Sequence, residues 1–157
     1  TKYIAFLDSD DTWAKNKLKI QVNYMEKNNI LFSHTSYHVI NKNNKIVSSR
    51  FAKNKIIFKD LIRSCDIGLS TVILKSSLLI KNKLLFPKMK TKEDYVLWLN
   101  LSKDGHEFKA LNESLTDWKL SKNSLSSSTL RKLIDGCNLF NLYLLINLAY
   151  FIAFKVS

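Results

Sequence analysis

The acidic stretch Asp8-Ser9-Asp10-Asp11 follows directly on an apolar run at residues 3–7, and this junction constrains the fold more than any other part of the sequence. Five apolar residues are too few for a helix and are typical of a strand covered on both faces, as in parallel sheets. Leu18, Val22 and Met25 then recur at helical spacing, with Asp10, Asp11 or Thr12 placed to cap the helix. The sequence therefore predicts an α/β fold in which a buried strand delivers carboxylates to a helix start, where open α/β sheets bind ligands.

This acidic junction has two interpretations. Asp8, Asp10 and Asp11 repel one another unless a cation neutralises them, and Mg²⁺ or Mn²⁺ held by one or two carboxylates plus a diphosphate suits such a group. The same residue types also cap helices without any ligand. In isolation the motif does not decide between the two.

A second acidic pair, Glu93-Asp94, begins a predicted helix that contains Trp98 and that Gly105 can close. Acidic residues are common in first helical turns because the helix dipole favours them there. By itself the pair is therefore best explained by helix stability.

The remaining patterns complete an α/β chain. We expect a strand at 30–40 with a hairpin partner at 46–48, a short helix at 58–64, a buried strand at 70–75, a helix near 76–82, and short strands at 107–111 and 114–120. Residues 1–127 are expected to form the α/β domain and residues 128–157 a helical segment.

The charge balance bears on the partners. With 25 Lys and Arg against 13 Asp and Glu, the net charge of +12 suits nucleic acid, an anionic membrane surface or a phosphate-bearing ligand. Arg50, Arg63 and Arg131 are the only arginines, although readers of bases and phosphates favour the guanidinium group. We therefore expect no nucleic-acid partner.

The C-terminal segment is different in character. No charge lies between Asp135 and Lys155, and residues 139–154 are apolar around nearly the whole helix, interrupted by Asn141 and Asn147. We consider three interpretations, in order of preference. They are a helix packed on the domain or on a missing partner, an interfacial membrane helix, and a membrane span. A peripheral membrane contact is therefore one expectation.

The cysteines and histidines predict no metal centre. Cys65 and Cys137 lie far apart without a C-x-x-C pattern, which favours a reducing compartment. His34 and His38 share a face of the predicted strand but have no third ligand nearby, so we expect packing or surface roles.

Taken together, the motifs resemble the family 2 glycosyltransferases of bacterial surface polysaccharide synthesis. The resemblance runs from Tyr3 to about Ser127. It is carried in order by Leu7-Asp8-Ser9-Asp10-Asp11-x-Trp13, Lys17-Leu18, Gln21, Phe86, Glu93-Asp94-Tyr95-x-Leu97-Trp98-Leu99, Trp118-Lys119 and Ser124-Leu125-Ser126.

The resemblance implies a GT-A fold, a Rossmann-like mixed sheet that holds a nucleotide-diphospho-sugar donor over Mn²⁺ or Mg²⁺. It gives Asp10 the metal and diphosphate, and Asp8 a metal or ribose contact. It makes Asp94 the catalytic base beside Glu93. The family's domain begins with a nucleotide-binding segment, which we expect to be absent because the chain enters a strand at Tyr3 without a preceding methionine.

The other donor-binding candidates are Asp11, Trp13, Trp118 and Lys119. Trp13 and Trp118 flank the acidic loop and the last loop, and either can line the sugar pocket. Lys119 can meet a phosphate as a point charge, where relatives often have arginine. Ser121 stands where relatives often have histidine, so the chain departs from the family's pattern in that loop.

These observations predict an inverting, metal-dependent hexosyltransferase. Its acceptor would be a glycan or a lipid-linked sugar in lipopolysaccharide or capsule assembly, and its place the cytoplasm or the inner face of the plasma membrane. The alternatives are an inactive fragment or acceptor-binding module of such an enzyme, and a basic membrane-surface binding protein.

Overall fold

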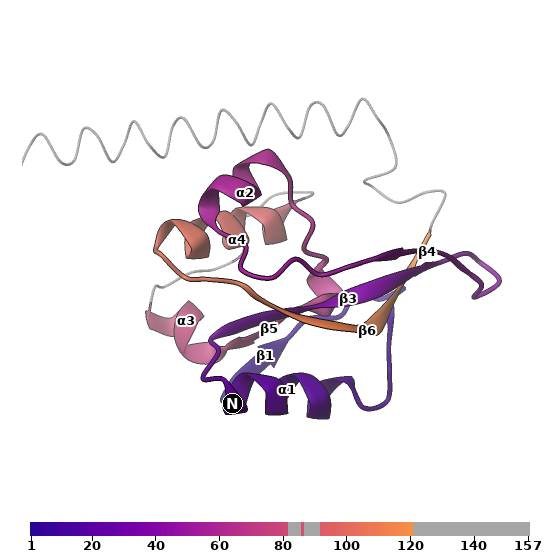
Figure 1. The fold of residues 1–157 in the computed structure, drawn as a ribbon, viewed down its shortest axis with the longest axis horizontal. Coiled ribbons are helices and arrows are strands. Elements are labelled where there is room, and N and C mark those ends of the chain that lie inside the picture. Colours follow the sequence, from indigo (N-terminus) through magenta and orange to yellow (C-terminus); the bar gives the residue numbers. More distant parts are fainter. Residues whose placement is uncertain (82–85, 87–91, 121–157) are drawn as a thin grey trace, which may run out of the picture. The chain divides into compact units, whose positions relative to one another are not determined.

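The computed structural model describes residues 1–81, Phe86 and residues 92–120 (Figure 1). The elements are β1 (Tyr3–Ala5), β2 (Thr12–Trp13), α1 (Lys17–Lys27), β3 (Phe32–Ile40), β4 (Ile46–Arg50), α2 (Phe58–Arg63), the 3-10 turn η1 (Leu69–Thr71), β5 (Ile73–Lys75), α3 (Ser76–Lys81), α4 (Glu93–Lys103) and β6 (Lys109–Lys119). The expected segment 128–157 lies outside the described residues.

The strands form one mixed sheet in the order β1-β5-β3-β6-β2, with β4 paired to the outer part of β3. The central β3–β6 pair is parallel and the other pairs are antiparallel. The register of the β3–β6 pair shifts on either side of Ser36, where β6 carries extra residues. Such bulges bend a strand, so what we expected as two short strands is one bent β6.

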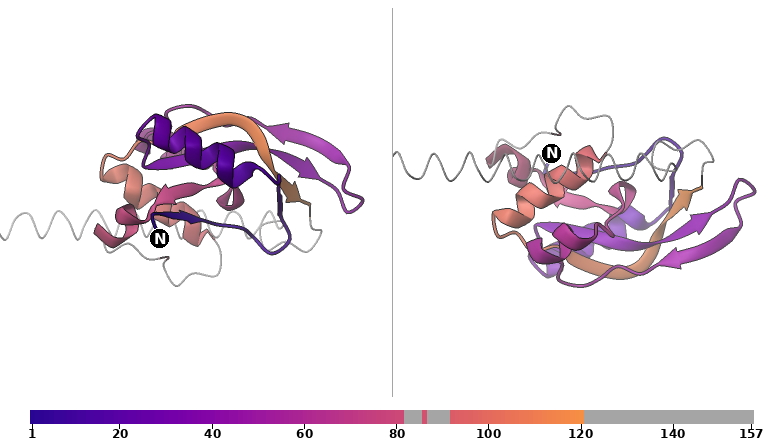
Figure 2. Two further views of the ribbon diagram at one scale, coloured as in Figure 1. Left: turned by 90° about the horizontal axis from the view of Figure 1, so that it is seen from below. Right: turned by 90° about the horizontal axis from the view of Figure 1, so that it is seen from above.

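Two apolar clusters cover the two faces of this sheet. On one face, Met25 of α1 packs with Ile30 and Ile73. On the other face, Leu61 of α2 and Trp98 of α4 join the core of the sheet. Figure 2 shows α1 alone on its side of the sheet, and α2 with α4 on the other. The predicted α/β class is confirmed.

The predicted environment of the first strand is wrong. β1 runs antiparallel to β5, with Tyr3 opposite Lys75, and β5 is its only partner in the described part of the chain. Ala5 is exposed and Leu7 is 48% exposed. The apolar run is therefore an edge strand rather than one covered on both faces.

The predicted start of the first helix is also wrong. α1 begins at Lys17 with Asn16 as its N-cap, and Asn16 makes no side-chain capping bond. Thr12 and Trp13 instead pair with β6 as a short strand, because β6 offers them backbone partners that the sequence pattern does not reveal. Asp10 and Asp11 therefore do not cap this helix.

The end of α4 agrees with the prediction. Gly105 has φ +83°, the left-handed conformation that glycine adopts without steric cost. The N–H groups of Gly105 and His106 donate to the carbonyls of Ser102 and Leu101, which closes the helix. None of the helices in these described ranges has the length and apolar character needed to cross a bilayer.

Candidate active site

The fold brings the two acidic motifs together. The pKa of the Asp8 carboxyl is raised to about 6, first because its surroundings partly dehydrate it and then because other carboxylates lie close to it. Those carboxylates, in order of effect, are Asp11, Asp10, Asp94 and Glu93. Residues more than eighty positions apart in the sequence thus form one electronegative site, which neither motif alone could predict.

Asp11 holds this loop in place. It is 7% exposed, and its Oδ1 accepts a 3.1 Å hydrogen bond from the backbone N–H of Lys119. The Asp11 N–H donates to the carbonyl of Asp8 at 3.1 Å. Burial raises the pKa of Asp11, while hydrogen bonds from Ser70 and Lys119 oppose the rise. The Asp11 carboxylate therefore makes its hydrogen bonds within the protein and positions the loop that carries Asp8 and Asp10. Asp8 and Asp10 themselves are exposed.

Ser70, which the sequence patterns did not single out, joins the loop to the centre of the sheet. Its Oγ accepts the backbone N–H of Asp8 at 3.0 Å. Its carbonyl accepts the indole N–H of Trp13 at 2.7 Å and the hydroxyl of Thr116 at 3.2 Å. A serine in an apolar stretch carries no signal of this role in the sequence.

A buried lysine supports the same turn from behind. Lys17 is fully buried, and its Nζ donates to Oε1 of Gln21 and, at 3.3 Å, to the carbonyl of Thr71. The Nζ also lies 5.0 Å from the ring centre of Trp13. Gln21 Nε2 donates to the same Thr71 carbonyl at 3.0 Å. This network fixes η1, and through Ser70 it fixes the acidic loop.

The sequence signals for this network are the i, i+4 spacing of Lys17 and Gln21 and the place of both residues in the motif that resembles the family. No carboxylate pairs with Lys17 among the described residues, and burial lowers its pKa from 10.5 to about 8. The indole N–H of Trp13 donates to the Ser70 carbonyl, and its ring faces the Lys17 ammonium. Through these two contacts Trp13 supports the acidic loop.

Asp94 lies in the first turn of α4, which is firmly anchored. Burial, followed by the negative charge of Glu93, raises the pKa of Asp94, while backbone N–H groups in the turn oppose the rise. One residue on, the hydroxyl of Tyr95 donates to the carbonyl of Leu61 at 2.5 Å. Trp98 is fully buried and belongs to the apolar core. Asp94 thus stands on a helix that is anchored in the core.

The end of β6 borders the acidic loop. Trp118 and Lys119 are both half-buried, and strand alternation directs them to opposite faces. The bond from the Lys119 N–H to Asp11 places the backbone of this strand end beside the loop. The Ser124-Leu125-Ser126 motif lies outside the described residues.

The acidic cluster fits a divalent cation shared with a ligand. Its donors are carboxylate oxygens, which Mg²⁺ and Mn²⁺ prefer, and Asp8 lies close enough to Asp10, Asp11, Glu93 and Asp94 for their charges to raise its pKa. Across residues 1–81 and 92–120, no three Asp, Glu, His or Cys side chains are close enough to enclose a metal by themselves. A metal held by one or two carboxylates plus phosphate oxygens meets both observations.

The histidines do not form a metal pair. His34 is buried, and burial lowers its pKa to about 4. His38 Nδ1 lies 3.0 Å from the Ser49 hydroxyl across the β3–β4 pair. Both have the packing roles expected from the sequence.

A mixed sheet with helices on both faces and acidic groups gathered at one site agrees with the GT-A class of nucleotide-diphospho-sugar transferase folds that the resemblance implies. The sequence profile of the glycosyl transferase family 2 matches residues 1–85, more than half of the chain, and the chain belongs to this family.

Several relatives that are named as glycosyltransferases support the family assignment. The chain is 43% identical over 134 residues to the Escherichia coli UDP-Glc:alpha-D-GlcNAc-diphosphoundecaprenol beta-1,3-glucosyltransferase WfgD, covering 84% of this chain and 51% of WfgD. It is 37% identical to WfaP, an Escherichia coli enzyme of the same description, covering 87% and 53%. It is 31% identical to the putative teichuronic acid biosynthesis glycosyltransferase TuaG of Bacillus subtilis, covering 81% and 50%. The chain thus spans about half the length of these relatives.

Solved structures confirm the fold. The chain superposes on S. aureus TarS 1-349 in complex with UDP-GlcNAc with a TM-score of 0.62 and 18% identity, covering 81% of this chain and 37% of that one. The complex of the same protein with UDP gives a TM-score of 0.59, also at 18% identity, covering 76% and 36%. At this identity the comparison establishes the GT-A fold.

Proposed function

We propose that this chain is the metal- and acceptor-binding part of an inverting glycosyltransferase that moves a sugar, most simply glucose, from a UDP-sugar to a diphosphoundecaprenol-linked acceptor. The observation that carries the proposal is the gathering of Asp8, Asp10, Glu93 and Asp94 into one site. Donor and acceptor are taken from WfgD and WfaP, whose names specify UDP-glucose and GlcNAc-diphosphoundecaprenol.

In this proposal Asp10 and Asp8 hold Mn²⁺ or Mg²⁺ against the donor diphosphate. When bound, the metal neutralises the charge that develops on the leaving nucleoside diphosphate. Asp11 keeps both carboxylates in place through its bond to Lys119. The Lys119 side chain adds a cation for the diphosphate, and Trp118 lines the donor pocket.

Asp94 serves as the general base. The acceptor hydroxyl gives its proton to the Asp94 carboxylate while its oxygen bonds to the anomeric carbon, and the bond from that carbon to the diphosphate oxygen breaks. The raised pKa of Asp94 makes its carboxylate a stronger base than an exposed aspartate. Attack on the face opposite the leaving group inverts the anomeric configuration. Glu93 adds to the negative charge of this turn.

A complete enzyme of this kind would meet its lipid-linked acceptor at the inner face of the plasma membrane. We include in the proposal a peripheral membrane contact by the 128–157 segment. An acceptor-binding module without turnover is the second candidate, because the chain spans about half of its relatives.

A donor screen tests this function. The complete enzyme that carries this chain is incubated with a GlcNAc-diphospho-lipid acceptor and separate UDP-sugars, with Mn²⁺ or with EDTA, and UDP release is recorded. We expect release from UDP-glucose that needs both acceptor and metal. Release from no donor would leave the binding-module alternative, and full release in EDTA would refute the roles of Asp8 and Asp10.

A further inference from the structure

The surface segment at residues 50–63 combines exposed apolar side chains with positive charge. It runs from the end of β4 through α2. Phe51 is 78% exposed, Ile57 45% and Ile62 48%. The cations of the segment are Arg50, Lys53, Lys55, Lys59 and Arg63, against one carboxylate, Asp60.

The backbone of this segment is held by hydrogen bonds, although these side chains are exposed. The N–H of Ala52 donates to the Ser36 hydroxyl at 2.9 Å, and Ile56 pairs with Phe108. Ile56 and Leu61 are buried in the core, while the residue that follows each of them, Ile57 or Ile62, faces solvent. Ile56 and Leu61 therefore anchor this segment to the core, and the exposed side chains add nothing to the core.

The cations of the segment also meet in space. Lys53, Lys55 and Arg63 line one hollow of about 290 Å³, together with Asp60 and Asp66. Lys53 pairs with Asp66 at 2.6 Å, and Lys55 lies 4.0 Å from Glu107. The five cations outnumber Asp60 and these two carboxylates, so the surface stays positive.

We propose that the 50–63 segment is a docking surface for an anionic lipid bilayer. Phe51, Ile57 and Ile62 enter the boundary between headgroups and acyl chains, and the cations contact lipid phosphates. Apolar side chains flanked by Lys and Arg are the combination that interfacial binding requires, because each part contributes separately. This surface uses other residues than the 128–157 segment and the acidic site, and its binding does not depend on sugar transfer.

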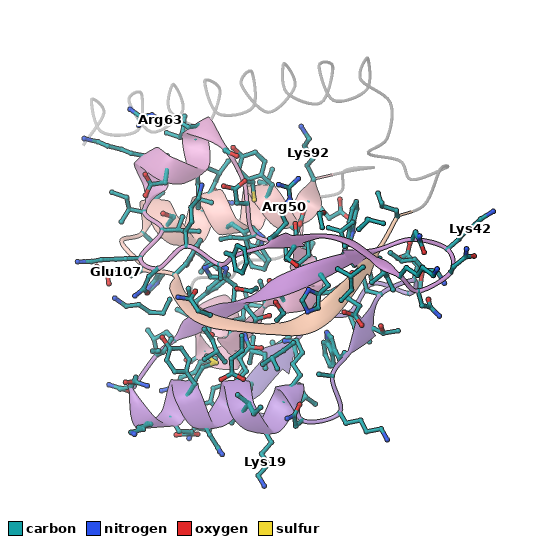
Figure 3. All side chains as sticks on the ribbon, turned by 45° about the vertical axis from the view of Figure 1, so that its right-hand side comes forward. Lys19, Lys42, Arg50, Arg63, Lys92 and Glu107 are labelled. Atoms are coloured by element: carbon teal, nitrogen blue, oxygen red, sulfur yellow. The ribbon has the colours of Figure 1, made fainter. Side chains whose placement is uncertain are left out.

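Vesicle flotation of the whole 157-residue chain tests the surface. The variant Lys53→Gln/Lys55→Gln/Arg63→Gln is compared with Lys15→Gln/Lys19→Gln/Lys27→Gln, which removes the same charge at and beside α1. Figure 3 shows Lys19 on α1 and Arg63 on α2 on opposite sides of the sheet. Both variants retain the 128–157 segment, so its contribution is constant.

We expect the wild-type chain to float with phosphatidylcholine vesicles containing phosphatidylglycerol and much less with phosphatidylcholine alone. Each surface cation contributes roughly fivefold to binding, so loss of three cations should weaken binding of the first variant about 100-fold, and the α1 variant should lose less than about threefold. Phe51→Ser/Ile62→Ser should weaken binding while leaving the circular dichroism spectrum unchanged.

Equal losses in the two charge variants would overturn the proposal, since the effect would then be net charge alone. Equal flotation with and without phosphatidylglycerol would also overturn it. A wild-type dimer that becomes a monomer in the Phe51→Ser/Ile62→Ser variant, with vesicle binding intact, would assign the surface to a second copy of the chain instead.

Discussion

Replacing Lys17 by methionine should remove a specific pH dependence of stability. In the folded chain burial lowers the Lys17 pKa to about 8, whereas in the unfolded chain it returns to its ordinary 10.5. Between these values the unfolded state binds the additional proton, so wild-type stability rises as pH rises. At 1.36 kcal/mol per pKa unit the rise is about 3 kcal/mol, present in full only above pH 10.5.

Methionine keeps most of the volume of this fully buried side chain and carries no charge. It leaves Oε1 of Gln21 without its Lys17 donor, which costs on the order of 1 kcal/mol. At pH 7 that loss is offset by removal of the buried charge, so the variant should be about as stable as the wild type or more so. At pH 10 the order should reverse.

Urea unfolding followed by circular dichroism at pH 7 and pH 10 measures both values. Lys19→Met, on the exposed side of α1, is the matched control and should follow the wild type at both pH values. If the difference between wild type and Lys17→Met is the same at pH 7 and pH 10, Lys17 does not titrate as a buried amine and the argument fails.

Three further results are expected. The folded-state pKa of Asp8, about 6, exceeds its unfolded value, so the metal-free chain should lose stability as pH rises from 4 to 6. Asp8→Asn should therefore raise Tm at pH 7 but not at pH 4. An unchanged Tm at pH 7 would contradict the crowding of carboxylates. Asp10→Ala in the complete enzyme should abolish metal-dependent turnover with Tm nearly unchanged, since Asp10 is exposed, and surviving turnover with the same metal response would argue against a ligand role. The 157-residue chain should bind UDP-sugars weakly in calorimetry, because it spans about half of its relatives, and a submicromolar Kd would refute this.

The sequence was sufficient for the features that depend on local patterns and on the order of motifs. The strand Phe32–Ile40, the helix Glu93–Lys103 and its closure by Gly105 follow from alternation, periodicity and the conformational freedom of glycine. The two acidic motifs were recognised together by their resemblance to the family, and the structure brings them to one site.

Features set by distant partners could not be predicted. Thr12 and Trp13 form a strand only because β6 lies beside them. A lysine in an amphipathic helix normally faces water, and only the positions of Thr71 and Trp13 show that Lys17 is buried. Ser70 binds the acidic loop through a turn that has no sequence pattern of its own.

The central claim is that Asp94 removes the proton from the acceptor, and kcat of Asp94→Asn tests it most directly. The substitution keeps the size of the side chain and removes its basicity, so kcat in the complete enzyme with saturating acceptor should fall about 10²–10⁴-fold. Loss of a first-turn charge alone would cost only about 0.3–1 kcal/mol of stability. Glu93→Gln is the matched control and should retain most of its activity. An Asp94→Asn enzyme that keeps more than about a tenth of wild-type kcat would contradict the account.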